Sequence, residues 1–409
     1  MNKLPSRWEL KKIGELGKVI TGSTPSTQNK DNYENGIYNF YSPSDLINRK
    51  YVDNAEKKLS YKGFLLSKKI PKNSILITGI GDIGRVGITL KESATNQQIH
   101  SLIVKENYFV EFIYYELALN KKTLEKHSTK QTIEQLNKNN LENIQIPIPK
   151  SLEEQQKIAE ILSEVDRSIE LTKKIIEKEK RIKKGLMQDL LRYGIDENGN
   201  IRNPKTHKFK RSELGLIPKE WEVKKINEVC DILDNYRIPL NEEERQKRKG
   251  NIPYYGANGI IDFIDDYIFD DKLILLPEDG GNFENYKIKP IAYKVIGKCW
   301  VNNHAHVLKV KSIFDYDYVF YTLEHKDITY YISGGTRTKL NKSDLIKIKT
   351  SLPKSLEEQQ KIAKVLSLQD EKIEKLNKKL NKLEKIKKAL MQDLLTGKVR
   401  VTKLLKDKK

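Results

Sequence analysis

Three glycines follow a short apolar run at a spacing that is used to bind dinucleotides. Gly79, Gly81 and Gly84 spell GxGxxG directly after residues 74–78, SILIT. A dinucleotide site needs a helix at this point, because the helix N-terminus holds the pyrophosphate. The next residues instead have the pattern of a turn and a second strand, and the other half of the chain has no such triplet. We therefore interpret these glycines as tight turns.

A second pattern contains possible metal ligands. Cys299, His304 and His306 form C-x4-H-x-H, which has ligand types that zinc prefers. A fourth ligand at a suitable spacing is missing, and the run WVNNHAHVL alternates like a strand. The pattern therefore favours polar histidines on an exposed strand face, and we predict no metal site.

Other catalytic motifs are missing from the sequence. Methyl transfer to a base amino group calls for an Asn/Asp-Pro-Pro-aromatic stretch, but the chain has no Pro-Pro dipeptide. A Walker loop is absent too, so no ATP-driven motor is expected. Acid-x-Lys tripeptides such as the one from Asp270 to Lys272 arise by chance in a chain this rich in both types. These absences favour a chain that has no catalytic residues and no cofactor of its own.

The composition favours a polyanionic partner. The 409 residues include 76 Lys and Arg against 56 Asp and Glu, a net charge of +20. Such a surplus points to nucleic acid first, although a lysine-rich proteome gives the same surplus without a bound polyanion. The mean hydropathy is −0.65, and no apolar run has the length of a membrane span or signal peptide, so we expect a cytoplasmic protein. Its two cysteines, Cys230 and Cys299, are too few for a disulfide framework.

The chain is organised around a stretch that occurs twice. SLEEQQKIA begins at Ser151 and again at Ser355, and each copy leads to a shared LMQDLL close. The second copy keeps a heptad seam, which predicts a long helix with a partner for its apolar stripe. Its seam positions are Ile362, Leu366, Gln369, Ile373, Leu376, Leu380, Leu383, Lys387, Leu390 and Leu394. Two such helices in one chain most simply pack on each other.

The first copy of the helix is less regular in its second half. Thr172, Glu179 and Lys183 interrupt the seam with polar side chains. These positions are either solvated or face a partner subunit, and the sequence leaves both possibilities open. Each helix begins with a serine and two glutamates, which suits a capped start. The first would span roughly 60 Å, the dimension of a spacer.

The repeat extends beyond the helices. LPSRWELKKIGEL, residues 4–16, returns as IPKEWEVKKINEV, residues 217–229. The two inserts that follow differ in sequence, so one scaffold carries two divergent units. In the first insert, residues 74–78, 86–90 and 99–104 are predicted strands and residues 108–127 a helix. In the second insert, the predicted strands are residues 273–277, 291–295 and 306–310, with a helix in residues 315–326. Both inserts are therefore predicted to be mixed α/β units.

The duplicated frame resembles the specificity subunits of type I restriction–modification systems, the HsdS family. The resemblance covers nearly the whole chain. It is carried by the paired Trp-Glu openings, the SLEEQ helix starts after Pro149 and Pro353, the LMQDLL closes and the connector after Gly194. GDIGRVG at residues 81–87 and ATNQQ at residues 94–98 are similar to a common pattern of the first insert.

The resemblance implies an α+β fold in which two target recognition domains are joined and spaced by two long helices. These helices would form an antiparallel coiled coil with a pseudo-two-fold internal repeat. The implied parts are a first recognition domain at residues 1–148, a first spacer helix at 149–193, a linker at 194–212, a second recognition domain at 213–352, a second spacer helix at 353–398 and a mobile basic tail at 399–409.

The resemblance also implies a function. Each recognition domain would read one half of a split site in double-stranded DNA. The helices would dock two modification subunits that use S-adenosylmethionine, joined by restriction subunits that use ATP and magnesium. The catalytic residues would lie in those partners, in agreement with the missing motifs. A coiled-coil adaptor that binds only proteins is the alternative, and an autonomous nuclease or methyltransferase is a third.

The candidate DNA-binding residues lie in loops rich in Gly, Ser, Thr or Asn. Basic side chains there suit phosphate contacts, while amides suit paired hydrogen bonds to base edges. The predicted phosphate contacts are Arg85, Lys130, Arg337 and Lys339. The predicted base readers are Asn96, Gln97, Gln98, Gln131, Asn258, Asn302 and Asn303. Tyr41, Tyr254 and Tyr255 are predicted to pack on sugars.

Overall fold

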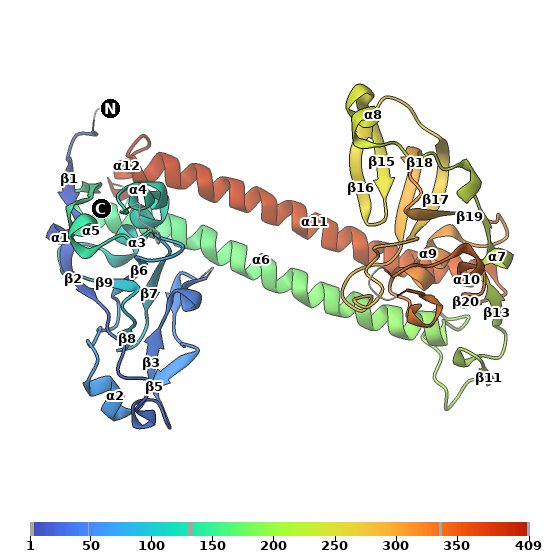
Figure 1. Ribbon diagram of the computed structural model, residues 1–409, viewed down its shortest axis with the longest axis horizontal. Helices are drawn as coiled ribbons and strands as arrows, with labels where there is room; N and C mark the ends of the chain where they lie inside the picture. The colour runs from blue at the N-terminus through green and yellow to red at the C-terminus, as the bar shows by residue number, and fades with distance from the viewer. Residues whose placement is uncertain (1–3, 48, 130–133, 335–337, 407–409) are drawn as a thin grey trace. The chain divides into compact units, whose positions relative to one another are not determined.

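The computed structural model describes residues 4–47, 49–129, 134–334 and 338–406, and these form two compact units (Figure 1). The first unit comprises Met1–Lys173 together with Lys379–Lys409, and the second comprises Lys174–Lys378. The two long helices, α6 (Leu152–Tyr193) and α11 (Leu356–Leu395), each begin in one unit and end in the other. No helix in the described ranges has both the length and the apolarity to cross a membrane.

The first unit contains a five-stranded sheet in the order β2-β9-β6-β7-β4 and a three-stranded sheet in the order β5-β3-β8. The strands are β2 (Gly17–Thr21), β3 (Tyr38–Tyr41), β4 (Tyr51–Val52), β5 (Lys57–Leu59), β6 (Ile75–Thr78), β7 (Val86–Thr89), β8 (Ala94–Thr95) and β9 (Ile99–Val104). The helices are α1 (Ile13–Leu16), α2 (Tyr61–Leu65), α3 (Val110–Leu119), α4 (Lys121–Lys126), α5 (Lys138–Asn143) and the C-terminal α12 (Thr402–Lys406). An antiparallel ribbon of β1 (Trp8–Lys12) and β10 (Gln145–Pro149) joins the insert to α6.

The second unit contains a six-stranded sheet in the order β14-β19-β17-β18-β15-β16. The strands are β14 (Cys230–Ile232), β15 (Lys249–Gly256), β16 (Gly259–Ile264), β17 (Phe269–Pro277), β18 (Tyr293–Val301) and β19 (Ala305–Val310). The helices are α7 (Ile226–Val229), α8 (Glu242–Lys247), α9 (Tyr316–Glu324) and α10 (Lys342–Leu345). β13 (Glu222–Lys225) pairs with β20 (Lys349–Leu352), and the connector forms the hairpin of β11 (Phe209–Ser212) and β12 (Gly215–Pro218). Single 3-10 turns lie at Lys30–Asn32, Pro43–Leu46, Asp234–Tyr236 and Thr329–Tyr331.

The two inserts have the same strand order, although their sequences differ. β2-β9-β6-β7 and β14-β19-β17-β18 are the same four-stranded order. β3 pairs in parallel with β8 through Tyr41, and β15 pairs in parallel with the end of β18 through Tyr255. The predicted strands and helices are confirmed, except that the first predicted helix is broken at Asn120 into α3 and α4. The predicted fold class, two mixed units on two long helices, is correct.

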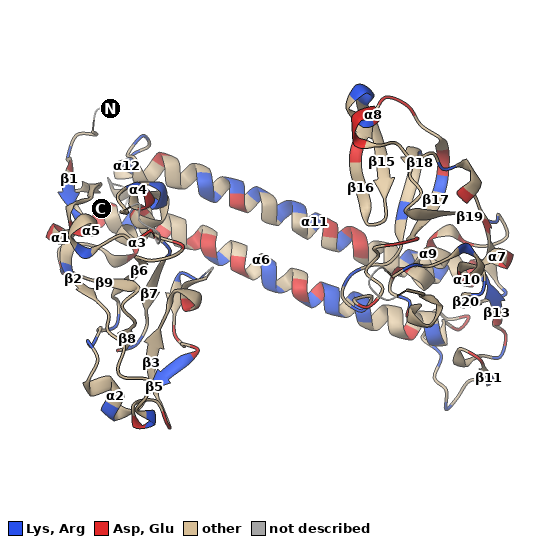
Figure 2. Ribbon diagram, viewed as in Figure 1, with Lys and Arg blue, Asp and Glu red and all other residues tan. Residues whose placement is uncertain are grey.

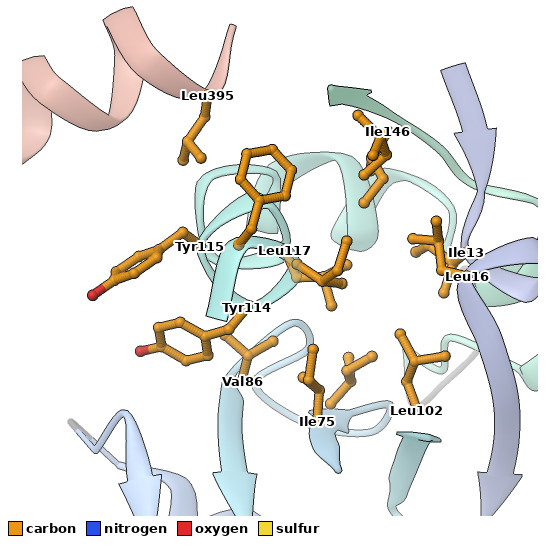
Figure 3. Packing of buried hydrophobic residues seen from close by; sticks show 14 of the residues in the cluster. Ile13, Leu16, Ile75, Val86, Leu102, Tyr114, Tyr115, Leu117, Ile146 and Leu395 are labelled. Atoms are coloured by element: carbon orange, nitrogen blue, oxygen red, sulfur yellow. The ribbon is translucent and has the colours of Figure 1, made fainter. Parts of the chain in front are cut away.

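The core of the first unit lies between α3 and the larger sheet. Figure 3 shows Leu117 of α3 among Ile75, Leu102 and Ile146, with Leu395 of α11 closing one side. All five side chains are at most 1% exposed. Burying each of them stabilises the fold by roughly 1.5–3 kcal/mol. The last turn of α11 is therefore part of this core.

The SLEEQ phrase marks the start of each long helix, and its serine, second glutamate and glutamine form hydrogen bonds there. Ser151 and Ser355 accept a hydrogen bond from the backbone three residues on, which confirms the predicted caps. The buried Gln155 donates to the carbonyl of Pro149 and accepts from the amide of Phe109. Gln359 makes the same two bonds in the second unit, to Pro353 and Asp315. The glutamine thus joins each insert to its helix.

The second glutamate of the phrase holds the tryptophan that opens each half. Glu358 accepts from Trp221 Nε1 at 3.2 Å and from both terminal nitrogens of Arg202. Glu154 accepts from Trp8 Nε1 at 3.4 Å and from Arg400 Nε at 2.7 Å. The connector in one unit and the C-terminal segment in the other therefore supply equivalent arginines.

The C-terminal segment has a defined place in the structure as far as it is described. Val401 is 2% exposed in the core of the first unit, and Arg400 also donates to the carbonyl of Ser6. The expectation of a mobile tail does not hold for these residues, because both are held by the first unit.

The polar residues in the seam of α6 face the interior of the chain. Thr172 is 3% exposed and donates to its own helix at Ser168. Glu179 accepts from Gln369 at 2.7 Å and pairs with Lys372. The two helices meet antiparallel within each unit, and their outer faces carry interspersed acidic and basic residues (Figure 2).

Lys183, the last of these interruptions, lies in a pattern that both units share. Its ammonium is 2.7 Å from Asp370, which accepts from the hydroxyl of Tyr321. In the first unit, Lys387 is 2.6 Å from Asp166, which accepts from Tyr115. Lys183 has a second partner, Glu324, at 2.9 Å. The seam positions are thus satisfied by residues of this chain.

A buried glutamate in α3 makes the first unit sensitive to pH. Glu116 is 0% exposed, and only its Oε2 has a hydrogen-bond donor, Asn120, among the described residues. Burial raises the pKa of this carboxyl well above its usual value. The folded state then keeps a proton that the unfolded chain releases above about pH 4.3. Stability is therefore lost as the pH rises above that value, by up to about 1.4 kcal/mol per pH unit until the folded-state pKa is reached.

We expect Glu116→Gln to remove this pH dependence. At about pH 4 the variant should differ little from the parent, and at pH 8 it should be more stable by at least about 1 kcal/mol. Urea unfolding at about pH 4, 6.5 and 8 measures the difference. Glu125→Gln, at an exposed position in α4, is the control and should leave the pH profile unchanged. A Glu116→Gln profile parallel to that of the parent would contradict the assignment.

Candidate functional site

Three loops meet at one end of the larger sheet in the first unit. They are the loop after β6 (residues 79–85), the turn before β9 (residues 96–98) and residues 128–129 and 134–136, which follow α4. We call this set the first three-loop site. The amide of Gly79 donates to the carbonyl of Gln98 at 2.8 Å, and the amide of Leu136 donates to the carbonyl of Gly79 at 2.8 Å. Backbone hydrogen bonds thus link all three loops.

A buried histidine of β9 hydrogen-bonds to one segment of the first three-loop site. His100 of β9 is 3% exposed, and its Nε2 is 2.7 Å from the carbonyl oxygen of Leu136. A carbonyl only accepts, so Nε2 carries the proton. Burial lowers the pKa of His100, which favours the neutral ring. Nδ1 then accepts from the hydroxyl of Thr21 at 2.9 Å.

The turn before β9 is held by its first residue. Asn96 Oδ1 accepts from the amide of Gln98 at 3.1 Å, and its own amide donates to the carbonyl of Tyr41. Gln97, at the tip, is exposed and bonds to Thr24. Gln98 Oε1 accepts from Asn96 Nδ2 at 2.9 Å.

The second unit repeats this assembly bond for bond. The second three-loop site comprises the loop after β17 (residues 278–292), the turn before β19 (residues 302–304) and residues 333–334 and 338–340. The amide of Glu278 donates to the carbonyl of His304, and the amide of Leu340 donates to the carbonyl of Glu278. Asn302 Oδ1 accepts from the amide of His304 at 2.8 Å, and its amide donates to Tyr255. His306 Nε2 lies 2.8 Å from the carbonyl of Leu340.

The electrostatics beneath the two sites differ. His306 Nδ1 faces Asp234 at 2.7 Å, where the first unit has a threonine. Burial raises the pKa of Asp234, but the hydrogen bond from His306 and the nearby positive charges outweigh it, so the net pKa is lowered. Arg237 donates to Glu278 at 2.7 Å, and Lys339 is 3.1 Å from the same carboxylate. The histidine below the first site therefore bonds to an uncharged threonine, whereas the second site is held by charged side chains.

Most sequence-predicted residues lie in or beside these sites. In the first site, Arg85 donates to Asp82 at 2.6 Å, and Asn96, Gln97 and Gln98 form the turn. In the second, Asn302 and Asn303 form the turn, Asn258 donates to the carbonyl of Gly280, and Lys339 lies in the third loop. Lys130, Gln131 and Arg337 lie outside the described residues. DNA contact by any of these residues stays a prediction.

Two of the three predicted tyrosines are buried. Tyr41 is 0% exposed and donates to the carbonyl of Val52, and Tyr254 is 1% exposed with its hydroxyl at the backbone of Leu240. Their rings fill the cores under β3 and β15, so they have no surface to offer a sugar. Tyr255 is half-buried and contributes its carbonyl to the turn.

The two histidines of the C-x4-H-x-H pattern were interpreted incorrectly as exposed strand residues. His306 is 1% exposed, and His304 lies in the turn, where its Nδ1 is 2.9 Å from Asp279. Among the described residues, no group of three or more His, Cys, Asp or Glu side chains could hold a metal ion. Cys299 is buried, and it takes no part in the hydrogen bonds of His304 or His306.

His100 and His306 were missed as functional residues, although the sequence carried a signal for them. Asn96-x3-His100 and Asn302-x3-His306 are the same spacing in two inserts of otherwise different sequence. The asparagine forms the turn and the histidine anchors the neighbouring loop. The arrangement presents amides and basic side chains from a fixed backbone, which suits binding of a polar or anionic surface.

Comparisons with known proteins agree with this duplication. A family model described as the type I restriction modification DNA specificity domain matches residues 5–180 and again residues 218–385. The type I restriction enzyme MjaIX specificity subunit of Methanocaldococcus jannaschii is 30% identical over 373 residues, which cover 84% of this chain and 83% of that protein. The MjaVIII specificity subunit of the same organism is 29% identical and covers 98% of this chain and 95% of that protein.

A solved structure is similar in fold. The crystal structure of the type I restriction–modification S subunit from M. genitalium matches with a TM-score of 0.65 and 19% identity, covering 96% of this chain and 97% of that one. At this identity the likeness supports the fold.

Proposed function

The chain belongs to the type I restriction–modification DNA specificity family, and from this premise we propose that each of its three-loop sites reads one half of a bipartite DNA sequence. As a specificity subunit it is a non-catalytic component of a restriction–modification complex. This agrees with the missing catalytic motifs. In this proposal the first and second three-loop sites contact DNA, and each recognises one half-site.

One observation carries the proposal: the same backbone frame is built twice and presents different side chains. The hydrogen bonds through Gly79, Gln98 and Leu136 recur through Glu278, His304 and Leu340. A shared frame suits the part of the task that is common to both halves, which is to hold a DNA backbone of constant geometry. The differing side chains suit the part that is not common, which is to read two different base sequences.

We propose the partners that the family resemblance implies. The complex would contain two modification subunits, which bind S-adenosylmethionine, and restriction subunits, which use ATP and magnesium. This chain would itself bind no cofactor. The long helices would supply the docking surface for the modification subunits and set the distance between half-sites. The exposed mixed charge of α6 and α11 (Figure 2) supports docking by complementary charges.

The test is methylation by the assembled complex. The chain is purified with its modification subunits, incubated with S-adenosylmethionine and genomic DNA, and the methylated positions are sequenced. We expect one motif with two defined segments separated by a fixed run of unspecified bases, and no methylation or cleavage by the chain alone. Sequence-independent methylation, or activity of the rigorously purified chain alone, would contradict the proposal.

A further inference from the structure

We propose that Asn303, at the tip of the turn in the second three-loop site, reads an A·T base pair of the second half-site, and that His304 contacts the neighbouring base pair. This inference rests on the proposed function and assigns its specificity-determining residues in one unit. Asn302, although it is the first residue of the same turn, acts as a positioning residue.

The three residues of this turn have different duties. Asn302 is 6% exposed, and its Oδ1 is occupied by the amide of His304. Asn303 is exposed, and its side-chain amide makes no hydrogen bond with any described residue. In the first unit, the equivalent Gln97 and Gln98 are both bonded within their own unit, to Thr24 and Asn96. Asn303 therefore keeps both its donor and its acceptor for another molecule.

His304 is oriented by a charge behind it. Its Nδ1 lies 2.9 Å from the carboxylate of Asp279, in the loop after β17. Its backbone is held on both sides, by Asn302 Oδ1 and by the amide of Glu278. With Nδ1 engaged, Nε2 on the other side of the half-exposed ring is the nitrogen left for DNA.

The turn borders a pocket of about 480 Å³. Its lining comprises Asn302, Asn303 and His304 of the turn, the apolar Pro239, Leu240 and Ile261, and the polar Asn241, Glu244, Arg245 and Tyr254. Ile261 belongs to β16 and is 55% exposed. Arg245, from α8, donates from Nε to Asp262 and from Nη1 to the carbonyl of Leu240. The lining of the pocket therefore includes both an unpaired amide, that of Asn303, and exposed apolar surface, that of Ile261.

This combination matches one base pair better than the others. An asparagine amide makes a bidentate pair with N6 and N7 of adenine, and an apolar side chain contacts the methyl group of thymine. Asn303 supplies the first and Ile261 the second. A G·C pair would lack the methyl group and would set its O6 acceptor against the amide oxygen of the bidentate pair. The pocket thus favours A·T, and His304 Nε2 lies one residue further along to contact the neighbouring pair.

The experiment compares variants of the full chain assembled with its modification subunits, by sequencing the methylated motif. Asn303→Ala should lower discrimination at one A·T position of the second half-site by about 5- to 150-fold. The first half-site should be unchanged. Asn227→Ala, an exposed asparagine in α7, is the matched control and should leave the motif intact.

A second variant makes the test independent of folding losses. Asn303→Asp has the same shape but only accepts hydrogen bonds, so preference at this position should change from adenine to cytosine, whose N4 amino group donates. If both Asn303 variants methylate the parental motif with parental discrimination, the inference is overturned while the proposed function stands. If the parent complex itself shows no bipartite motif, the proposed function fails.

Discussion

A chain in which residues 17–148 are replaced by the first insert of another specificity subunit is expected to recognise a hybrid site. The half read by the second unit should be kept, and the other half should become that of the donor. Specific protein–DNA complexes exceed non-specific ones by roughly 10³- to 10⁷-fold. Discrimination for the original first half-site should therefore fall by roughly 10³-fold or more.

The structure explains why this exchange should be tolerated. The insert is attached to the frame by the β1–β10 ribbon and by the polar contacts of Phe109 with Gln155, Tyr115 with Asp166 and Lys50 with Ser163. It also shares a hydrophobic core with Ile158 and Leu162 of α6 and Leu395 of α11, so the donor insert must match these apolar positions. A donor insert with a tyrosine at the position of Tyr115 preserves the central polar contact. The methylated motif of the assembled complex is the measurement. The reciprocal exchange of the second insert is the control and should alter only the other half. A change in both halves, or in neither, would show that the inserts do not read separately.

Glu358→Ala is expected to destabilise the second unit by about 3–5 kcal/mol, the usual cost of removing one partner of a buried ion pair. The carboxylate is 12% exposed and receives both terminal nitrogens of Arg202, Trp221 Nε1 and the amide of Ile195. Its loss leaves a buried guanidinium and two buried N–H groups without an acceptor. Urea unfolding followed by tryptophan fluorescence reports the change directly, because Trp221 is one of the groups affected.

The neighbouring glutamate provides a matched control. Glu357 lies on the same helix turn with 73% of its side chain exposed and pairs with Lys361, so Glu357→Ala should cost less than about 1 kcal/mol. Glu154→Ala tests the equivalent bond in the first unit and should resemble Glu358→Ala, since Glu154 is 2% exposed and holds Arg400 and Trp8. Equal, small losses for Glu357→Ala and Glu358→Ala would mean that the buried pair does not stabilise the fold.

The architecture was predictable because the motifs that mark its helix starts occur twice in the sequence. The two SLEEQQKIA phrases predict the helix starts, and the serine, the second glutamate and the first glutamine make hydrogen bonds in both copies, as with Gln155 and Gln359. The polar seam positions of α6 were not predictable. Their partners, such as Gln369 for Glu179 and Glu324 for Lys183, are remote in sequence, and periodicity does not reveal which polar pairs will meet.

The candidate site was predictable in place but not in detail. Loop composition located Asn96, Asn302 and Lys339 near one another in their units, because amides and basic residues gather where strands end. The separate roles of the turn residues could not be predicted, because Asn302 and Asn303 are the same residue type. Only the structure shows that Asn302 bonds to the backbone of the turn and that Asn303 is exposed. Burial also reversed the expectation for Tyr41, Tyr254 and His306, whose aromatic rings suit a core as well as a surface.

The placement of Arg400 and Val401 in the first unit has a consequence for synthesis on the ribosome. The second unit is one continuous stretch, Lys174–Lys378, and all of its contacts are available as soon as that stretch has emerged. The first unit needs Lys379–Lys409, so Trp8 and Glu154 wait for their arginine until the whole second unit has been translated. At about 5–20 residues per second, the roughly 200 residues in between take roughly 10–40 s. The segment that is made first is therefore completed only after the second unit, and loss of Arg400 and Val401 would damage the N-terminal unit.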